Sequence, residues 1–360
     1  MKKIVINGQF LARRITGQER FALETVLELD KLIKKNSLEL IVPTHVQNLP
    51  QLDNIKTVKF GSFKGSLWEQ LDFSRYVVKN RALSLNLCSV MPIIEPGIIC
   101  IHDLSYKVNP HYCKHVYGKI SQIWHKLFFN LAWKFSPIIY TVSEYSKKQM
   151  IDIYNVKEDK IHVIANGWQH FKRIEEDDKI FEKWPRLEDK KFYFMVGSLS
   201  PNKNLEWIYG AAKNNTEAVF AVAGNVVAYG NRYSHDDSEN VLLLGYVSDS
   251  EMKSLMSHCK AFIFPSFFEG FGIPPLEAMS VGAKVLVSNT SCLPEIYKDS
   301  AIYIDPYNFN VDLEKMLTIK TESADKILKK YDYKNSAISI YNDLLVFNRT
   351  IENQHKIKGL

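Results

Sequence analysis

The sequence lacks most features that would place it outside ordinary globular proteins. No apolar run approaches the ~20 residues that a membrane-spanning helix needs. The opening MKKIVING turns polar too soon for a secretory signal, so we expect none. The five cysteines are scattered and form no CxxC pair, which argues against a disulfide framework or zinc site and suits reduced thiols in the cytosol. Repeats and low-complexity tracts are also absent.

The charge is unevenly distributed along the chain. Residues 1–170 hold 23 Lys and Arg against 14 Asp and Glu, whereas the remainder holds 23 against 26. A basic N-terminal half suits an anionic lipid surface, an anionic acceptor or a nucleic acid. A solvated basic surface gives the same excess, so the charge alone does not choose between these interpretations.

The length and the order of patterns indicate two α/β domains. A chain of 360 residues exceeds the usual size of a single hydrophobic core. Short apolar strands alternate with helical patterns throughout, which is typical of parallel sheets. We therefore expect a Rossmann-like domain over residues 1–170, a charged linker over 171–190 and a second Rossmann-like domain over 191–334.

The expected strands are short apolar runs bounded by polar or turn residues. They are Ile4–Ile6, Leu38–Val42, Ile98–Ile101, Ile138–Val142 and Ile161–Ile164 in the first domain, and Phe192–Val196, Ala218–Ala223, Val241–Leu244, Ala261–Phe264, Lys284–Val287 and Ala301–Ile304 in the second. Two capping boxes, Thr16 with Glu19 and Ser248 with Glu251, predict helix starts. Doubly wound sheets bind ligands at the carboxyl ends of their strands, so functional residues are expected there.

The segment FPSFFEGFGIPPLEAM, residues 264–279, combines a phosphate cradle with two carboxylates. Prolines are tolerated at a helix start, and the free amides and glycines there allow an anion to approach the main chain. Because Glu269 and Glu277 flank the cradle, we expect a ligand with hydroxyls as well as phosphate, such as a nucleotide sugar. The expected lining of the cradle is Gly270, Phe271, Gly272, Ile273 and Leu276.

The spacing of the two glutamates within EGFGIPPLEAM resembles the signature of glycosyltransferase family 4, whose members are retaining enzymes of the GT-B fold. Similar segments stand in order along most of the chain: TGQERFALE near the N-terminus, IHDLSY at 101–106, TVSEYSK at 141–147, IANG at 164–167, VGSLSPNKN at 196–204, GYVSDSEMKSLMSHCKAFIFPS before the motif and VGAKVLVSNTSCLPEIYKDSAIYIDP after it. The resemblance implies two Rossmann-like doubly wound domains facing across a cleft. It also implies that a last helix, at 335–360, crosses back to the first domain.

The resemblance assigns three charged residues of the second half to the donor. Glu269 would contact the sugar or its leaving phosphate, where a carboxylate stabilises an oxocarbenium-like transition state. Glu277, placed in the first turn of its helix, would bind the ribose hydroxyls; a carboxylate there also stabilises the helix itself. Lys203 would neutralise the diphosphate.

The donor site departs from the family pattern at two positions. The family usually offers an arginine right after the glycine of VGSLSPNKN or just before its lysine, where this chain has Ser198 and Asn202. Ser198 stays among the expected donor contacts. Tyr246 and Val247 follow a strand where the family binds the base through main-chain groups.

The first half offers a smaller set of candidates. Gly17, at the start of the first helix, resembles the family's donor and acceptor loop, where helix amides approach phosphate. His102 follows a strand end, and the resemblance makes it a catalytic contact of the donor sugar. A histidine satisfied by Asp103 or the main chain gives the same pattern. The residues that would supplement Lys203 or serve the acceptor side are Arg13, Arg14, Arg20 and Asp103.

Residues 117–135 form a basic aromatic helical pattern with one apolar face. That face comprises Ile120, Ile123, Trp124, Leu127, Phe128, Leu131 and Phe135. Such a helix can lie on a membrane. A helix that packs on the core of the first domain shows the same pattern, and we favour this interpretation.

The function implied by the resemblance is retaining transfer of a hexose or deoxyhexose from a nucleotide sugar to a saccharide acceptor, lipid-linked, in surface polysaccharide biosynthesis such as that of O-antigen or capsule. The leaving phosphate would help to deprotonate the acceptor. Two alternatives stay open: a non-catalytic nucleotide-sugar-binding partner, and an epimerase or phosphorylase of the same fold. The missing arginine is the one hint toward the first, and the presence of Glu269, Glu277 and Lys203 opposes it.

The expected ligands follow from the same resemblance. The chain has no apolar-flanked DxD motif of the kind that holds a metal in the other main glycosyltransferase fold, so we expect neither an essential metal nor another cofactor. The expected partners are a nucleotide sugar, a glycan or lipid-linked glycan and the anionic inner face of the membrane, with no nucleic acid. The expected location is cytoplasmic, with peripheral contact at that face.

Overall fold

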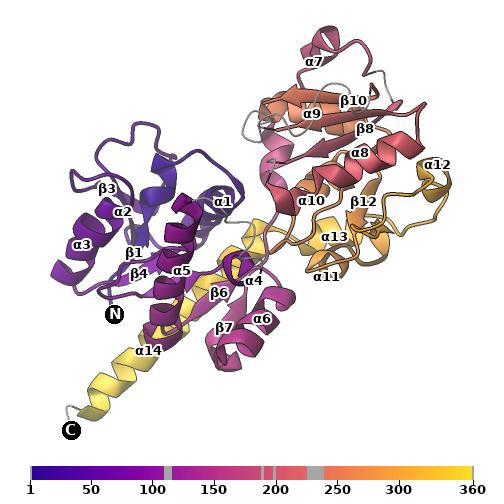
Figure 1. Ribbon diagram of the computed structural model, residues 1–360. Helices are drawn as coiled ribbons and strands as arrows, with labels where there is room; N and C mark the ends of the chain where they lie inside the picture. The colour runs from indigo at the N-terminus through magenta and orange to yellow at the C-terminus, as the bar shows by residue number, and fades with distance from the viewer. Residues whose placement is uncertain (1, 109–115, 188–189, 198–199, 225–238, 359–360) are drawn as a thin grey trace. The chain divides into compact units, whose positions relative to one another are not determined.

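The computed structural model describes the chain except residues 1, 109–115, 188–189, 198–199, 225–238 and 359–360, and it divides into two compact units (Figure 1). Unit 1 comprises Met1–Asn166 with Asp332–Leu360, and unit 2 comprises Gly167–Tyr331. Every helix among the described residues is too short or too polar to cross a bilayer.

Unit 1 is built on a parallel sheet of seven strands in the order β3-β2-β1-β4-β5-β6-β7. The strands are β1 (Ile4–Asn7), β2 (Leu38–Val42), β3 (Lys56–Lys59), β4 (Leu83–Asn86), β5 (Ile98–Cys100), β6 (Ile139–Thr141) and β7 (Ile161–Val163). The α-helices are α1 (Gly17–Leu32), α2 (Gly65–Leu67), α3 (Ser74–Lys79), α4 (Ser105–Val108), α5 (Val116–Phe135), α6 (Glu144–Tyr154) and α14 (Tyr333–Lys358). Short helical turns are η1 (Gly8–Ala12), the π-helix η2 (Trp68–Phe73) and η4 (Glu158–Lys160).

Unit 2 has a parallel sheet of six strands in the order β10-β9-β8-β11-β12-β13. The strands are β8 (Phe192–Val196), β9 (Val219–Ala223), β10 (Val241–Gly245), β11 (Ala261–Phe264), β12 (Val285–Ser288) and β13 (Ile302–Ile304). The α-helices are α7 (Lys179–Lys183), α8 (Leu205–Asn214), α9 (Asp249–His258), α10 (Ile273–Ser280), α11 (Leu293–Tyr297), α12 (Leu313–Met316) and α13 (Asp325–Lys330). The remaining turns are η5 (Gln169–Arg173), η6 (Pro201–Lys203) and η8 (Lys298–Ser300).

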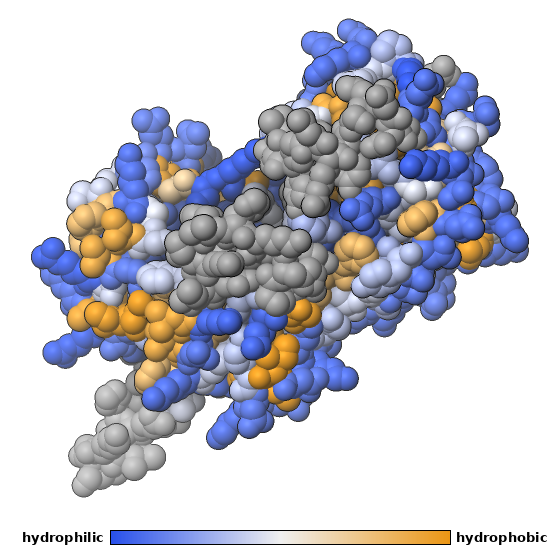
Figure 2. All heavy atoms as spheres, in the orientation of Figure 1, coloured by the Kyte–Doolittle hydropathy of each residue, from blue (hydrophilic) through white to orange (hydrophobic). Residues whose placement is uncertain are grey.

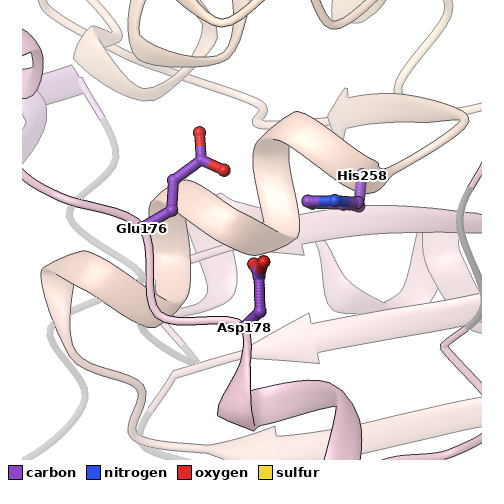
Figure 3. Close-up of side chains that lie close together, drawn as sticks. All are labelled: Glu176, Asp178 and His258. Carbon is purple, nitrogen blue, oxygen red and sulfur yellow. The ribbon is translucent and has the colours of Figure 1, made fainter.

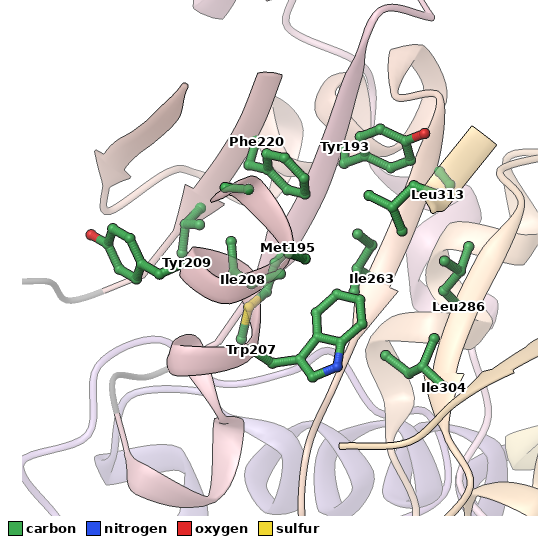
Figure 4. Close-up of a cluster of buried hydrophobic side chains, with 14 of the residues drawn as sticks. Tyr193, Met195, Trp207, Ile208, Tyr209, Phe220, Ile263, Leu286, Ile304 and Leu313 are labelled. Atoms are coloured by element: carbon green, nitrogen blue, oxygen red, sulfur yellow. The ribbon is translucent and has the colours of Figure 1, made fainter. Parts of the chain in front are cut away.

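Burial explains why the strands of unit 2 were the easier ones to predict. A parallel sheet covered on both faces needs strands that are apolar along their whole length, and β11 is buried at all four positions. Figure 4 shows one side of this core, where Trp207 of α8 lies among side chains of the sheet such as Met195 and Ile263. The indole nitrogen of Trp207 donates to the carbonyl oxygens of Asp305 and Asn308, so its one polar group is satisfied.

Two strands of unit 1 have no counterpart among the predicted ones. β3 reads KTVK and is half exposed, so it carries no apolar run. β4 reads LSLN, and its buried Ser84 and Asn86 break the apolar pattern. Edge position explains the first, because a strand with one neighbour tolerates polar residues. Side-chain hydrogen bonds explain the second: the Asn86 side-chain nitrogen donates to the carbonyl oxygens of Pro96 and Ile98.

Both predicted capping boxes are present at the starts of α1 and α9. At α9, the Ser248 hydroxyl accepts from the Glu251 amide at 3.1 Å, and the Glu251 carboxylate accepts from the Ser248 amide at 2.7 Å. These reciprocal bonds satisfy amides that a helix start leaves unpaired.

The expected linker and the last helix belong to different units. Residues 171–190 are grouped with unit 2 and include α7, which packs on α9. α14 is grouped with unit 1 and packs on α1.

α5 follows the core-packing interpretation over the part whose side chains are described. Phe128 is fully buried, with Trp124 and Leu131 packed against the same cluster. Leu127 and Phe135 of the predicted apolar face are instead exposed. Ile120 and Ile123 lie outside the residues whose side chains the structure describes.

Candidate active site

The candidate site lies where the strand order of unit 2 reverses. From β8 the chain winds through β9 to β10 on one side, and from β11 through β12 to β13 on the other. The connections that follow β8 and β11 therefore leave the same edge of the sheet in opposite directions. In doubly wound sheets this switch point is the usual ligand site.

Lys203 and Glu269 meet at this switch point. Lys203 ends η6, which follows β8, and Glu269 lies in the loop after β11. The Lys203 Nζ is 2.6 Å from the Glu269 Oε1, and the two side chains are only 20% and 14% exposed. The ammonium also lies 5.0 Å from the ring centroid of Phe264. The sequence analysis assigned Glu269 to the sugar or its leaving phosphate and Lys203 to the diphosphate, and in the structure the two side chains form one ion pair.

Main-chain contacts fix the two loops that carry this ion pair. The Phe267 amide donates to the carbonyl oxygen of Asn202 at 2.8 Å, which joins the two loops. The Glu269 amide donates to the Ser291 hydroxyl at 3.2 Å, and the Cys292 thiol donates to the Glu269 carbonyl oxygen at 3.3 Å. The carboxylate therefore projects from a loop that is held on both sides, as a preorganised site requires.

The start of α10 depends on Gly272. This residue has a φ of 84° as the N-cap, and a Cβ there would meet Leu293 Cδ2 at 2.9 Å. Only glycine adopts such a backbone without strain. Pro274 and Pro275 then occupy early helical positions, so their missing N–H groups cost nothing. The cradle predicted from the sequence is thus a real helix start, with Gly270 buried just before it.

One detail of that prediction needs correction. α10 begins at Ile273, one residue before the prolines, so Glu277 lies in the second turn and the first turn contains no acidic residue. Its interaction with the helix dipole is correspondingly weaker, because that effect fades beyond the first turn. Phe271 and Leu276 are buried at 3% and 0% exposure, so neither presents its side chain at the surface.

Glu277 has a buried partner that the sequence did not reveal. The His170 Nε2 is 2.8 Å from the Glu277 Oε1, and the side chains are 3% and 9% exposed. His170 comes from η5, which packs against α10 although it lies 107 residues away in the sequence. The carboxylate accepts, so Nε2 carries the proton. The sequence analysis gave His170 no role, because nothing local shows a contact with a residue 107 positions away.

Two of the three remaining donor candidates lie among the described residues, and they differ in exposure. Tyr246 is 68% exposed just after β10, whereas Val247 is 8% exposed. Ser198 lies outside the described residues.

His102 lies at the carboxyl end of β5 in unit 1. Its ring is buried, and Nε2 is 2.9 Å from the Leu87 carbonyl oxygen, so Nε2 carries the proton and donates. Burial lowers the pKa of His102, so the ring is neutral at pH 7 and presents Nδ1 as an acceptor. Asp103 does not fix the ring; its carboxylate accepts from the Ser105 amide at 2.7 Å and caps α4. Of the two partners considered for the His102 ring, Asp103 and the main chain, the main chain is the one observed.

The candidate residues near the start of α1 differ in their ion pairing and exposure. Arg13 is engaged by two carboxylates, at 3.4 Å from Glu69 and 3.9 Å from Glu19. Gly17, the first residue of α1, and Arg14 are exposed, and Arg20 is partly exposed. Arg13 thus has two acidic partners within unit 1.

A separate group of side chains on unit 2 has metal-ligating character (Figure 3). One ligand atom each of Glu176, Asp178 and His258 lies within 4.8 Å of the others, the one such trio among the described residues. His258 Nδ1 donates to the Ser254 carbonyl oxygen at 2.9 Å, which leaves Nε2 for a ligand. His258 precedes β11 whereas Glu269 follows it, so the trio lies at the opposite edge of the sheet from the ion pair.

The comparison with known families bears on unit 2. Residues 176–334 match the family model described as glycosyl transferases group 1. The match includes the switch point, the ion pair and the start of α10. This part of the chain carries that family's domain, as the resemblance implied.

Curated relatives extend the likeness to most of the chain. The chain is 25% identical over 332 residues to the O-antigen chain mannosyltransferase RfbU of Salmonella typhimurium, covering 84% of this chain and 87% of the relative. It is 25% identical over 345 residues to the O-antigen chain mannosyltransferase B of Escherichia coli, again covering 84% and 87%.

Solved structures agree on the fold. The sucrose-phosphate synthase of Thermosynechococcus elongatus superposes with a TM-score of 0.70 at 13% identity, over 96% of this chain and 100% of that one. Anabaena Alr3699/HepE, in complex with UDP and glucose, gives 0.65 at 15% identity over 96% and 100%. The expected GT-B fold is confirmed. The family match of residues 176–334 and the curated relatives, taken together, support a glycosyltransferase.

Proposed function

We propose that the chain transfers a hexose from a nucleotide sugar to a saccharide acceptor with retention of the anomeric configuration, in the synthesis of a bacterial surface polysaccharide. The observation that carries this proposal is the Lys203–Glu269 ion pair at the switch point of unit 2. It offers a cation to the diphosphate and a carboxylate to the positive charge that develops on the sugar. The nearby His170–Glu277 pair offers a carboxylate to the ribose hydroxyls.

The proposed reaction needs no covalent intermediate on the protein. The bond from the anomeric carbon to the leaving phosphate breaks, and the acceptor hydroxyl attacks from the same face. The leaving phosphate oxygen takes the acceptor proton. Lys203 stabilises the departing diphosphate, the positive end of the α10 dipole adds to this effect, and the neutral ring of His102 offers an acceptor to a hydroxyl of the sugar.

The names of the relatives supply the setting. RfbU and mannosyltransferase B are O-antigen mannosyltransferases, and another relative, from Escherichia coli, is named a galactosyltransferase acting on a diphosphoundecaprenol-linked sugar. From these names we infer that the acceptor of this chain is a lipid-linked saccharide at the cytoplasmic face of the membrane. The donor test is release of nucleoside diphosphate from UDP-, GDP- and dTDP-sugars by the purified chain. Absence of release with every donor, with or without lipid-linked acceptor, would refute the proposal.

A non-catalytic nucleotide-sugar-binding protein and an epimerase of the same fold stay as alternatives. The first would bind nucleotide and release nothing. The second would convert a free nucleotide sugar into its epimer without an acceptor. Both are separated from transfer in the same assay by analysing the sugar as well as the nucleotide.

We expect activity to survive chelation by EDTA. The reason is that Lys203 and the start of α10 provide the positive charge that a divalent cation provides elsewhere. The measurement is turnover before and after dialysis against EDTA, with Mg²⁺ and Mn²⁺ added back. The matched variant is His258→Ala, which removes a ligand of the surface trio and is expected to leave turnover unchanged. Loss of turnover that the added ion restores would show that the reaction needs a metal.

Peripheral contact with an anionic membrane is a second part of the proposal. Exposed apolar side chains follow one another along α2, η2 and α3, and Figure 2 shows hydrophobic atoms gathered on that part of unit 1. They are Phe63, Leu67, Leu71 and Val78, with Lys64, Arg75 and Lys79 exposed on the same stretch. Exposed apolar groups flanked by basic residues suit the interface of an anionic bilayer.

We expect the double variant Leu67→Glu, Leu71→Glu to lose binding to vesicles that contain anionic lipid. These side chains are 60% and 50% exposed, so the change leaves the core intact while opposing both apolar insertion and charge attraction. The measurement is co-sedimentation with the vesicles. The control is Ile319→Glu in unit 2, which alters a side chain that is 52% exposed. Equal binding of the double variant and the wild type would exclude this surface.

A further inference from the structure

The buried side chain of Asn204 ties together loops at the carboxyl edge of the unit 2 sheet. Asn204 follows η6, which comes after β8, and it is 4% exposed. Its Nδ2 donates to the Pro265 carbonyl oxygen at 3.0 Å and to the Pro306 carbonyl oxygen at 2.8 Å. Pro265 directly follows β11, and Pro306 lies two residues after β13. We call these two hydrogen bonds the Asn204 clamp.

The backbone of Asn204 lies in the left-handed region, with φ 56° and ψ 52°. Residues with a Cβ rarely adopt this conformation, asparagine does so more readily than most, and glycine does so without steric cost. Glycine would therefore suit the turn from η6 into α8 at least as well as asparagine. It would lack the side-chain amide of the clamp, so the asparagine has a role beyond the turn.

Asn204 does not use its side chain as a helix N-cap ordinarily does. An asparagine at this position usually accepts a hydrogen bond from an amide in the first turn of the helix. Asn204 is the N-cap of α8, yet among the described residues its side chain makes no capping hydrogen bond. The side-chain amide is directed instead to the loops after β11 and β13. It therefore stabilises the arrangement of the loops rather than the helix start.

The loops that the clamp joins carry the ion pair of the candidate site. Lys203 directly precedes Asn204, and Glu269 lies in the loop that follows β11. On the other side of Lys203, the Asn202 carbonyl oxygen accepts from the Phe267 amide at 2.8 Å. Lys203 is thus bracketed by two residues that are both bonded to the loop of Glu269. Such bracketing fixes the root of a long flexible side chain whose Nζ must lie 2.6 Å from a carboxylate oxygen.

We propose that Asn204 is the positioning residue of the Lys203–Glu269 ion pair: through the clamp it holds the loop of Lys203 against the loop of Glu269. The proposal rests on the proposed function for the roles of the two charged residues in transfer. Asn204 acts through them and does not itself touch the donor. Because a misplacement of about 1 Å can cost about 100-fold in rate, the effect of the clamp falls on turnover.

The first test is the Asn204→Gly variant, which removes the clamp but permits the left-handed backbone. We expect kcat to fall at least about tenfold while the KM for the donor changes no more than about threefold. The measurement is initial-rate kinetics with the donor varied. When Asn204→Gly is combined with Lys203→Met, the loss in kcat is expected to be smaller than the product of the two single losses, because Asn204 acts through the lysine.

The matched control lies at the other end of α8. The Asn215 Nδ2 donates to the Ala211 carbonyl oxygen at 2.8 Å and to the Val311 carbonyl oxygen at 2.9 Å. Asn215→Gly therefore also removes a side-chain amide that bridges two carbonyl oxygens, but between α8 and β9, at the opposite edge of the sheet. We expect it to lower the temperature of unfolding at least as much as Asn204→Gly does and to keep wild-type kcat. Equal losses of kcat in the two variants would reduce Asn204 to a structural residue.

A second readout of the clamp does not require turnover. The Lys203 side chain is only 20% exposed within its ion pair, so we expect slow acetylation by a water-soluble N-hydroxysuccinimide ester. Peptide mass spectrometry follows the extent of labelling with time. Asn204→Gly is expected to raise the rate of labelling at Lys203 several-fold, because the loops then open more readily, and Asn215→Gly to leave it unchanged. A wild-type rate in Asn204→Gly, or an equal rise in both variants, would overturn the proposal.

The two readouts separate this proposal from the proposed function. A chain that releases nucleoside diphosphate from no donor, but whose labelling at Lys203 depends on Asn204, would keep the positioning role and defeat the transferase function. A chain that transfers sugar, and in which Asn204→Gly retains the kcat of the wild type, would defeat the positioning role alone.

Discussion

Replacing Glu269 with glutamine is expected to lower turnover at least about 100-fold while donor affinity changes no more than a few-fold. Glutamine keeps the shape and removes the negative charge that stabilises the oxocarbenium-like transition state. The positive charge on the sugar develops only in the transition state, so the loss falls on kcat more than on KM. The ion pair with Lys203 at 2.6 Å fixes where the carboxylate lies before reaction. The measurement is initial-rate kinetics with the donor varied.

The matched control for this variant is Glu314→Gln. Glu314 also pairs with a lysine, at 2.5 Å from Lys260, and Lys260 precedes β11 at the opposite edge of the sheet. The control makes the same change of charge and is expected to retain wild-type turnover. A Glu269→Gln enzyme with near wild-type turnover would make Glu269 a residue that orients its loop, and the catalytic role would then fall to His102.

Replacing Glu277 with glutamine is expected to weaken nucleotide binding by about 1.5–3 kcal/mol, or roughly 10- to 150-fold in Kd. The reason is the loss of a charged acceptor for the ribose hydroxyls. The side-chain oxygen of glutamine still accepts from the His170 Nε2, so the fold is expected to persist. The measurement is calorimetric titration with nucleoside diphosphates, with thermal unfolding as the stability check. Unchanged affinity would refute the ribose assignment.

His170 supplies a companion variant that tests the same contact indirectly. His170→Leu removes the donor that holds Glu277, and His170→Gln can restore one. The wild type is expected to prefer ribose to 2′-deoxyribose nucleotides. His170→Leu and Glu277→Gln are expected to lose most of that preference, and His170→Gln to regain part of it. A loss of stability alone, with the preference intact, would contradict a positioning role.

The parts of the fold that the sequence predicted are those with a local physical signature. The β2, β8 and β11 bounds agree with the prediction because these strands consist mostly of apolar, buried residues. The capping boxes of α1 and α9 could also be predicted from the sequence, because the two residues of each box lie only three positions apart. β3 and β4 lack such a signature, because one is a polar edge strand and the other buries asparagine and serine.

The sequence likewise identified individual residues of the candidate site but not the contacts between them. Glu269, Glu277 and Lys203 were identified individually through their motif context, but nothing local shows that Lys203 contacts Glu269 across 66 residues. His170 and Asn204 were missed entirely, because a partner far away in the sequence gives a residue its role. The helix start was one residue earlier than its prolines suggested, which moved Glu277 into the second turn.

The most direct test of the proposed function is the anomeric configuration of the first product. The purified chain is incubated with the donor it consumes and a lipid-diphosphate-linked saccharide, and the new glycosidic bond is followed by proton NMR from the first minutes. We predict that the product has the same anomeric configuration as the donor and forms in step with nucleoside diphosphate. An inverted product, or an epimerised donor with no new glycosidic bond, would contradict retaining transfer.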